Sequence, residues 1–155
     1  MNRFSRRSRD RLSTCHPDLV RLFEAVLRKQ DCMVLEGVRT PERQEALLRA
    51  GRSRTRNSRH LPGPDGLSRA ADVVPYPIPD WSDTAAFVAF GVLVVETARE
   101  LGIPLRWGGD WDGDGDRSDQ TFDDLVHFEL RDREPEHTLF PGRKVTLRLD
   151  KARLA

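Results

Sequence analysis

Residues 124–130 read Asp-Leu-Val-His-Phe-Glu-Leu, and this short run decides how the rest of the sequence is interpreted. The alternation of a β-strand would give it one apolar face and one face that carries His127 and Glu129. The apolar face is expected to pack inward, which directs His127 toward a cleft. Asp124 stands three residues earlier, so it reaches the same cleft only if the chain turns around Leu125 at the entry of the strand.

The sequence as a whole predicts helices alternating with short strands. We expect helices that open at Pro17, that run from Pro41 to Gly51, and that cover 82–101; strands are expected over 32–35, 70–74, 105–107, 126–130 and 145–149. The longest helix, capped by Asp80 or Ser82, is apolar on most of its surface and is expected to run through the core. Segregated helices and short strands indicate an α+β fold, a small antiparallel sheet with helices packed on it.

Length and composition limit the classes of protein to consider. We expect one compact domain over 1–155, with its core motifs in 36–130 and a C-terminal extension, 132–155, whose role the sequence does not reveal. A net charge of +1 gives no electrostatic case for nucleic acid, and no apolar run is long enough for stable membrane insertion. Cys15 and Cys32 are expected to be reduced, buried thiols, with a disulfide between them as the open alternative.

Charge is distributed unevenly along the chain. The N-terminal segment and residues 49–59 are rich in arginine, whereas residues 110–124 are rich in aspartate. A solvated surface is one explanation of the basic segments, and attraction to anionic wall polymer or lipid is the other.

Three short segments contain potential metal ligands, which are His60, Asp72 and His127. Zinc favours imidazole nitrogen and carboxylate oxygen, and a catalytic zinc site keeps three protein ligands and one open position. Two histidines and one aspartate supply such a set. Scattered residues of these types are also common as ordinary packed or surface side chains, so the surrounding motifs carry the argument.

Several motifs resemble those of the M15 peptidases, in particular the phage endolysins that are L-alanyl-D-glutamate peptidases, relatives of the D-Ala-D-Ala carboxypeptidases. These motifs are Ser58–Gly63, Ala70–Asp72, Trp107–Trp111 and Asp124–Glu129, preceded by Glu36–Gln44. They occur in the family's order, and the resemblance covers roughly residues 5 to 131.

The resemblance implies a Hedgehog/D-Ala-D-Ala peptidase-like fold and a zinc ion on His60, Asp72 and His127. It also implies that Asp124 is the general base, and that Arg39 steadies an oxyanion or a substrate carboxylate. A surface salt bridge is the plainer explanation of Arg39.

Three further residues are expected to support the site. Glu129 is a candidate to hydrogen-bond a ligand histidine, or else forms a structural ion pair. Ser58 and Gln44 are candidates to orient a ligand or the substrate. The chain departs from the family between His60 and Asp72, where an inserted segment makes Asp65 a rival ligand.

The acidic segment has the spacing of a calcium-binding loop. Its oxygen-bearing residues match the positions of an EF-hand-like loop and are Asp110, Asp112, Asp114, Asp116 and Ser118. Thr121 occupies the twelfth position, where a bidentate glutamate is usual, so a solvated acidic turn is the alternative.

The leading interpretation is a zinc-dependent endolysin that cleaves the L-Ala–D-Glu bond of the peptidoglycan stem peptide. The alternatives are a D-Ala-D-Ala carboxypeptidase or dipeptidase with the same site, and a zinc-bearing binding domain without catalysis. We expect the protein to be a monomer. The N-terminus lacks the apolar stretch of a signal peptide, so we also expect the protein to stay in the host cytoplasm until a holin-type partner opens the membrane. The protein is then expected to act on the wall.

Overall fold

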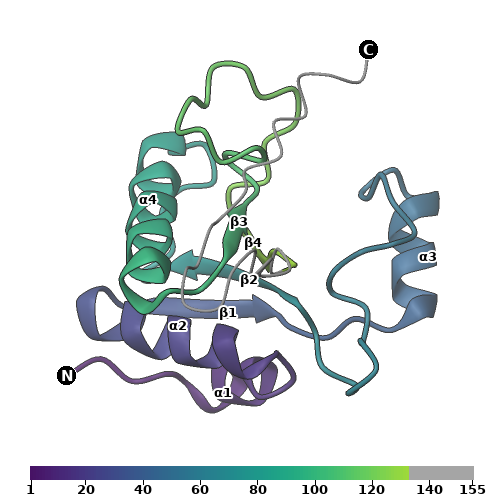
Figure 1. Cartoon of the computed structure of the whole chain (residues 1–155), viewed down its shortest axis with the longest axis horizontal. Coiled ribbons are helices and arrows are strands. Elements are labelled where there is room, and N and C mark those ends of the chain that lie inside the picture. Colours follow the sequence, from purple (N-terminus) through teal and green to yellow (C-terminus); the bar gives the residue numbers. More distant parts are fainter. Residues whose placement is uncertain (133–155) are drawn as a thin grey trace, which may run out of the picture.

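A four-stranded antiparallel sheet organises the protein, which the computed structural model describes over residues 1–132 (Figure 1). The strands follow the spatial order β1-β2-β4-β3. Their bounds are β1 Cys32–Glu36, β2 Ala70–Pro75, β3 Leu105–Trp107 and β4 His127–Leu130. The strand expected over 145–149 and the extension over 132–155 lie, beyond Asp132, outside the described residues.

Within residues 1–132, four helices accompany the sheet. They are α1 (Arg6–Leu12), α2 (Pro17–Lys29), α3 (Pro41–Arg49) and α4 (Thr84–Leu101). Among the described residues no helix combines the length and the apolar character needed to cross a membrane. The α+β fold class expected from the sequence is confirmed.

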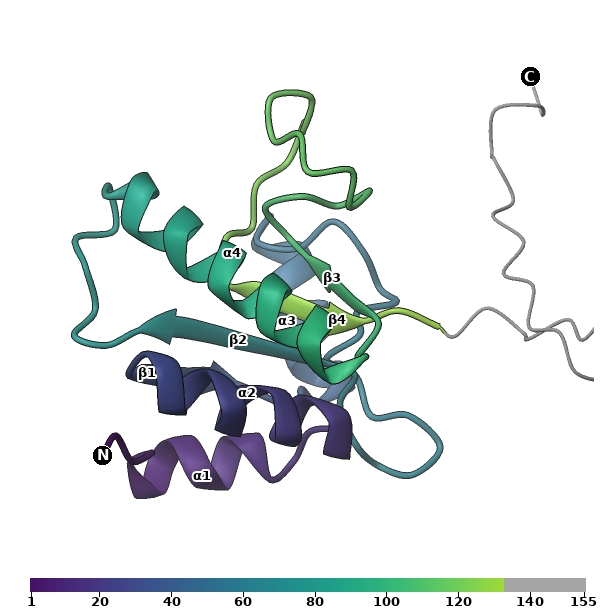
Figure 2. The ribbon, with the colours of Figure 1, turned by 60° about the vertical axis from the view of Figure 1, so that its left-hand side comes forward.

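The core lies between the sheet and the helices α2 and α4, which pack against each other (Figure 2). Phe128 of β4 is at its centre: its ring meets Phe23 of α2 and Phe90 of α4 edge-on and stacks on Trp107 of β3. Full burial of one such phenylalanine contributes about 1.5–3 kcal/mol. One face of the sheet is thereby used for stability, which leaves the other face for polar residues.

Helix α3 stands apart from this core, at the right of Figure 1, together with the loop that follows it. Thr40 caps the helix by accepting a hydrogen bond from the backbone N–H of Arg43, as its Thr-Pro start predicts. The only buried residue of α3 is the polar Gln44.

The structure corrects two expectations for the longest helix. Its cap is Asp83, which accepts from the N–H of Ala86, because Asp80 is already used in a local turn with Ser82. The helix also does not run through the core: one face is buried, and Val92 on the other is 44% exposed. The apolar composition of α4 therefore predicts more burial than the helix has.

Helix α1 was not predicted, because its arginines mask a small buried face. Leu12 and Ser8 supply that face, and the Ser8 hydroxyl accepts a hydrogen bond from the Val34 N–H of β1. Cys15 and Cys32 are free buried thiols, and burial raises the pKa of Cys15 to about 11 and that of Cys32 to about 12. The burial expected of both thiols agrees with the structure.

Candidate active site and metal centre

The register between β2 and β4 brings two of the three expected ligands together. Asp72 pairs directly with His127 across these strands. Alternation along β2 directs Ala71 and Val73 into the core and Asp72 to the opposite face. His127 leaves β4 on the same face, so the two side chains meet above the sheet.

His60 completes the group from the loop between α3 and β2. Its Nε2 atom lies 3.0 Å from Oδ1 of Asp72 and 3.2 Å from Nδ1 of His127, and these last two atoms are 3.1 Å apart. Tetrahedral zinc with bonds of about 2.0–2.1 Å places its ligand atoms about 3.3 Å apart. The three atoms therefore form a face on which such an ion fits, and this group could hold a metal.

The backbone of His60 is fixed on both sides. The N–H of His60 donates to the Ser58 hydroxyl at 3.2 Å, and its carbonyl accepts from the Arg39 N–H at 2.8 Å. The Nδ1 atom lies 2.7 Å from the carbonyl oxygen of Gly37. A carbonyl only accepts, so Nδ1 carries the proton and Nε2 is left with a lone pair toward the centre of the group.

Gly37 must be a glycine for this contact to exist. A Cβ atom at this position would lie 2.4 Å from both the Arg11 carbonyl and the Thr14 hydroxyl. Any larger residue would push the strand end away from α1, and the carbonyl that orients His60 would move with it.

His127 is oriented by Glu129, two residues further along the same face of β4. Its Nε2 donates to Oε2 of Glu129 at 2.8 Å, which leaves Nδ1 facing Asp72 and His60. Glu129 is in turn bound by Arg106 of β3, whose Nε donates at 2.8 Å. Burial raises the pKa of Glu129, but the hydrogen bonds from His127 and Arg106 outweigh it and hold the pKa below its usual range.

The electrostatics of the group call for a cation at its centre. Burial raises the pKa of Asp72, yet the hydrogen bonds from His127 and His60 bring it far below the usual range. Burial lowers the pKa of His127, but its bonds to Asp72 and Glu129 raise it to about 9. Asp72 and Glu129 thus favour a positive charge on or beside His127, which lies between them. A divalent ion bound at the ligand atoms would also supply that charge.

Asp124 reaches the same cleft through the expected turn. The His127 N–H donates to the Asp124 carbonyl at 3.1 Å, closing a tight turn over Leu125 and Val126. The Trp107 indole N–H holds this turn by donating to the Leu125 carbonyl at 2.9 Å.

Gly108 makes the close approach of this turn possible. The Asp124 N–H donates to the Gly108 carbonyl at 2.8 Å, and a Cβ on Gly108 would lie 2.2 Å from the Asp124 carbonyl oxygen. The carboxylate of Asp124 itself makes no hydrogen bond or ion pair within residues 1–132. Burial, followed by repulsion from Asp72, raises the pKa of this carboxyl.

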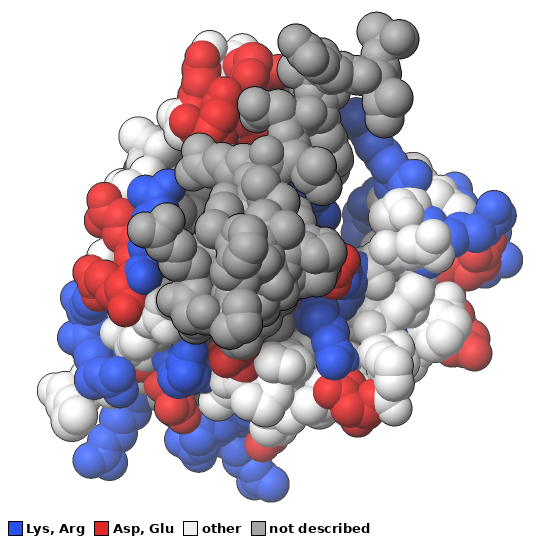
Figure 3. Space-filling model, in the orientation of Figure 1, with Lys and Arg blue, Asp and Glu red and all other residues white. Residues whose placement is uncertain are grey.

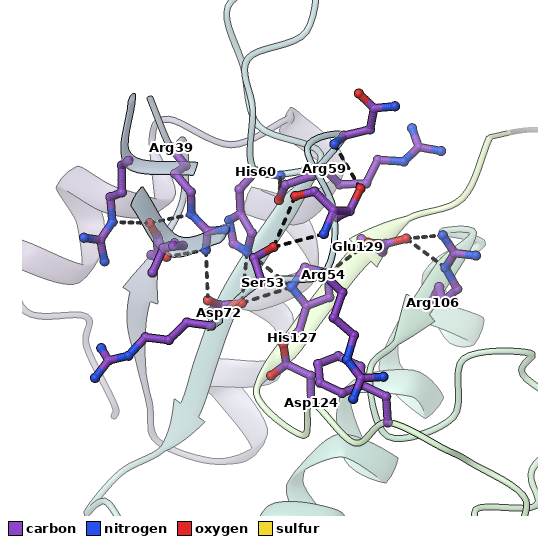
Figure 4. A pocket seen from close by; sticks show the side chains of 18 of the residues that line it. Arg39, Ser53, Arg54, Arg59, His60, Asp72, Arg106, Asp124, His127 and Glu129 are labelled. Carbon is purple, nitrogen blue, oxygen red and sulfur yellow. Dashed lines mark hydrogen bonds and ion pairs between the residues drawn. The ribbon is translucent and has the colours of Figure 1, made fainter. Parts of the chain in front are cut away.

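Arg39 lines the cleft but is also bound within the protein (Figure 4). Its Nη2 donates to Glu36 at 2.6 Å and lies 3.9 Å from Asp72, while Nη1 donates to Gln44 at 2.8 Å. A guanidinium has five N–H donors, and three of them are used here, because Nε also donates to Glu36. Arg39 therefore forms a salt bridge and also faces the cleft, so its two expected roles are compatible.

These side chains share one cleft of about 430 Å³ that also holds Ser58, Glu129 and Trp111. Gln44 is only 2% exposed and is not among the lining residues, so it acts on the loop beside the cleft rather than on a substrate. The inserted segment is also outside the lining. Its Asp65 is paired with Arg69 and does not join the ligand group.

Comparison with known proteins identifies the family. A family profile described as phage L-alanyl-D-glutamate peptidase matches residues 1–131. The L-alanyl-D-glutamate peptidase of Escherichia phage T5 is 30% identical over 125 residues, which span 76% of this chain and 88% of the phage protein. The chain belongs to the family of phage L-alanyl-D-glutamate peptidases.

A solved structure supports the same fold for this phage-type peptidase. The crystal structure of the L-Ala D-Glu endopeptidase ChiX from Serratia marcescens superposes with a TM-score of 0.67 at 36% identity, covering 84% of this chain and 91% of ChiX. The resemblance expected from the motifs is confirmed.

The acidic loop of the peptidase projects from the end of β3, away from α3 (Figures 1 and 3). Carboxylate oxygens of Asp110, Asp112 and Asp114 lie within 4.8 Å of one another and could hold a second cation. Asp116 is outside this group, and its Oδ1 accepts hydrogen bonds from the N–H and the hydroxyl of Ser118. Trp111 lies between the first two aspartates, and its ring is 5.6 Å from that of His127.

Sequence reasoning named Ser58 and Glu129, which contact the ligand histidines, but missed other residues that hold the site in place. Glu36 binds both Arg39 and Arg43 at the end of β1, directly opposite Asp72 in the register. Arg106 binds Glu129 in the same supporting way. A bulge between Val34 and Glu36 shifts this strand end, and such irregularities are not visible in a sequence pattern.

We predict that Glu36→Gln makes the stability of the peptidase less dependent on pH. Burial raises the pKa of Glu36, but hydrogen bonds from Arg39 outweigh burial and hold the pKa below its usual range. A lowered pKa adds stability above the unfolded-state pKa, and this stability is lost as the pH falls through the folded-state pKa. The variant should lose about 1–3 kcal/mol of unfolding free energy at pH 7 and less at pH 3, measured by urea denaturation.

The matched control is Glu45→Gln, which removes an exposed ion pair between α3 and Arg56 of the loop that follows it. That change should alter the unfolding free energy by less than about 0.5 kcal/mol. Equal losses in the two variants at pH 7 would contradict the role given to Glu36.

Proposed function

We propose that this chain is a zinc peptidase that hydrolyses the L-alanyl–D-glutamate bond of the peptidoglycan stem peptide. The observation that carries the proposal is the meeting of His60, Asp72 and His127 with a free carboxylate, Asp124, in one cleft. The named activities of the phage T5 and Serratia relatives supply the bond.

Zinc suits the donor set. Two imidazole nitrogens and one carboxylate oxygen form an open three-ligand arrangement of the kind that catalytic zinc occupies. Bound there, zinc supplies Lewis-acid chemistry, since it polarises a carbonyl oxygen and acidifies water. Ser58 and Gly37 hold His60, and Glu129 holds His127, so each ligand keeps its lone pair directed at the ion.

Asp124 is proposed as the general base. Its carboxylate has no partner to displace among the described residues, and burial raises its pKa, which makes it a stronger base than a surface aspartate. It takes a proton from the attacking water and delivers it to the leaving amine of D-glutamate. The turn fixed by Trp107 holds it at the cleft.

Arg39 is proposed to stabilise negative charge that develops on the scissile carbonyl oxygen. Two of its N–H groups are not used by Glu36 and Gln44, and its side chain is 10% exposed at the cleft wall. Because Glu36 and Gln44 fix its position, little reorganisation is needed when charge develops.

The cellular context is a further part of the proposal. We propose a monomer that is made in the host cytoplasm and acts on the wall after a holin-type partner has opened the membrane. The phage origin of the T5 relative supports this route.

The central test is digestion of purified peptidoglycan followed by mass spectrometry of the products. We expect new peptides that begin with D-glutamate, because the bond cut is on its amino side. Loss of a terminal D-alanine would instead identify a carboxypeptidase, and intact muropeptides would indicate a binding domain.

We predict that Asp124 and His127 separate metal binding from catalysis. Asp124→Asn should retain about one zinc per chain and lose at least about 10²-fold in hydrolysis rate, since general bases contribute this much. His127→Ala should lose zinc, as measured by elemental analysis of dialysed protein. Full activity in Asp124→Asn would overturn the base, and full zinc content in His127→Ala would overturn the ligand.

We also propose that Asp110, Asp112 and Asp114 bind calcium. Their clustered carboxylates and the glycine turns at Gly113 and Gly115 support an EF-hand-like loop, although the loop lacks a glutamate at its twelfth position. Calcium there would order Trp111, which lies between two of the ligands and against His127.

Calorimetric titration of zinc-loaded protein with calcium tests this loop. We expect binding with a dissociation constant on the order of 10⁻⁴–10⁻³ M and a change in tryptophan fluorescence. Asp112→Asn should weaken binding, whereas Asp119→Asn, a loop carboxylate outside the cluster, should not. No heat and no fluorescence change would remove calcium from the proposal.

A further inference from the structure

The cleft contains more positive charge than its own carboxylates neutralise. Six arginines and four acidic residues line it. The ion pairs of the wall join Arg39 and Arg43 to Glu36, Arg106 to Glu129, and Arg59 to Asp132. Within residues 1–132, Arg52 and Arg54 are the lining arginines with no carboxylate partner. The surplus is therefore concentrated in the loop after α3, the part of the molecule at the right of Figure 3, where blue side chains lie among white and red ones.

Arg54 is held over the cleft by an aromatic contact instead of an ion pair. Its guanidinium carbon lies 4.5 Å from the ring centroid of Phe122. Phe122 stacks on Trp111 at 6.1 Å, and Trp111 lies 5.6 Å from His127. This series of contacts links Arg54 to the wall beside the ligands, and Figure 4 shows its side chain directed toward the part of the cleft where Asp124 lies.

The loop that carries Arg54 is braced on both sides. The buried amide of Gln44 donates to the Ser53 hydroxyl at 2.8 Å and to the Thr55 carbonyl at 2.6 Å. The same amide accepts from Arg39 at 2.8 Å. Because the residues before and after Arg54 are anchored to the catalytic wall, its guanidinium is presented to a ligand with less loss of conformational entropy.

We propose that Arg54, with Arg52 beside it in the loop, forms a subsite that binds a carboxylate of the stem peptide. The inference rests on the proposed function. A guanidinium with no internal ion pair binds a carboxylate through two parallel N–H···O bonds, and stacking on an aromatic ring leaves its N–H edges available. The subsite selects stem peptides whose carboxylates are free over those in which they are amidated.

Two carboxylates of the substrate share this chemistry. A D-glutamate that is joined to the next residue through its side chain keeps a free α-carboxylate next to the scissile bond. A third stem residue that carries a side-chain carboxylate supplies the other, on the same side of that bond. Amidation of either group removes the charge and changes its shape little, so single amides identify the one that Arg54 binds.

The experiment compares three synthetic stem peptides: one with free carboxylates, one amidated at the D-glutamate α-carboxylate and one amidated at the third residue. Zinc-loaded wild-type protein, Arg54→Gln and the control Arg56→Gln are assayed for kcat and KM. Arg56 lies two residues away, pairs with Glu45 and does not line the cleft.

We expect the wild type to show a KM about tenfold lower for the free peptide than for one of the amides, the size of a charge-assisted hydrogen bond. Arg54→Gln should raise KM for the free peptide to the value of that amide, with kcat little changed. Arg56→Gln should behave as the wild type. Thermal melting establishes that both variants are folded.

Other outcomes distinguish a failure of the proposed subsite from a failure of the proposed function. Equal KM values of the wild type for all three peptides would overturn the subsite and leave the proposed function standing. An equal loss on all three peptides in Arg54→Gln would also overturn it, because it would mean that Arg54 only closes the cleft against Phe122. No cleavage of any peptide would count against the proposed function itself.

Discussion

The pairing of β2 with β4 is the constraint on which the site depends. In this antiparallel register Asp72 stands directly opposite His127, and neighbouring residues of both strands point into the core. A slip of one residue would turn Asp72 and His127 toward Phe23 and Phe90 and expose the apolar residues of both strands. The packing that stabilises the sheet therefore also fixes the distance between two ligand atoms, so folding and assembly of the site are one event.

Charge at the site is balanced in layers. The ligand group places Asp72 between two histidines, and the next layer adds Glu36 with Arg39 and Glu129 with Arg106. Each buried carboxylate thus has a partner of opposite charge, which offsets much of the cost of removing it from water. Asp124 is the exception. Its carboxylate lies in the cleft without a hydrogen bond among the described residues, and that arrangement is costly for stability and suited to proton transfer.

The sequence predicted the parts of the fold that local patterns determine. Thr40 before Pro41 marked the start of α3, and the alternation around His127 placed that residue on the polar face. Asp83 was missed as a cap because Asp80 and Ser82 offer the same chemistry within a few residues. The ligand set came from motifs rather than from periodicity, since the contact of His60 with Asp72 depends on a long loop whose path no local pattern specifies. Arg106, Glu36 and Gly37 were missed for the same reason, because each acts through a partner that is distant in sequence.

The two sides of the cleft are held by different kinds of interaction. The β-sheet side rests on the aromatic core around Phe128, whereas α3 buries no apolar residue and is joined to the sheet through the polar series of Glu36, Arg39 and Gln44. Polar contacts of this kind are more easily opened than a packed core. The α3 side of the cleft therefore depends on the contacts of Arg39 with Glu36 and Gln44 and on the contact of Arg54 with Phe122, whereas the positions of the ligands depend on the packed sheet.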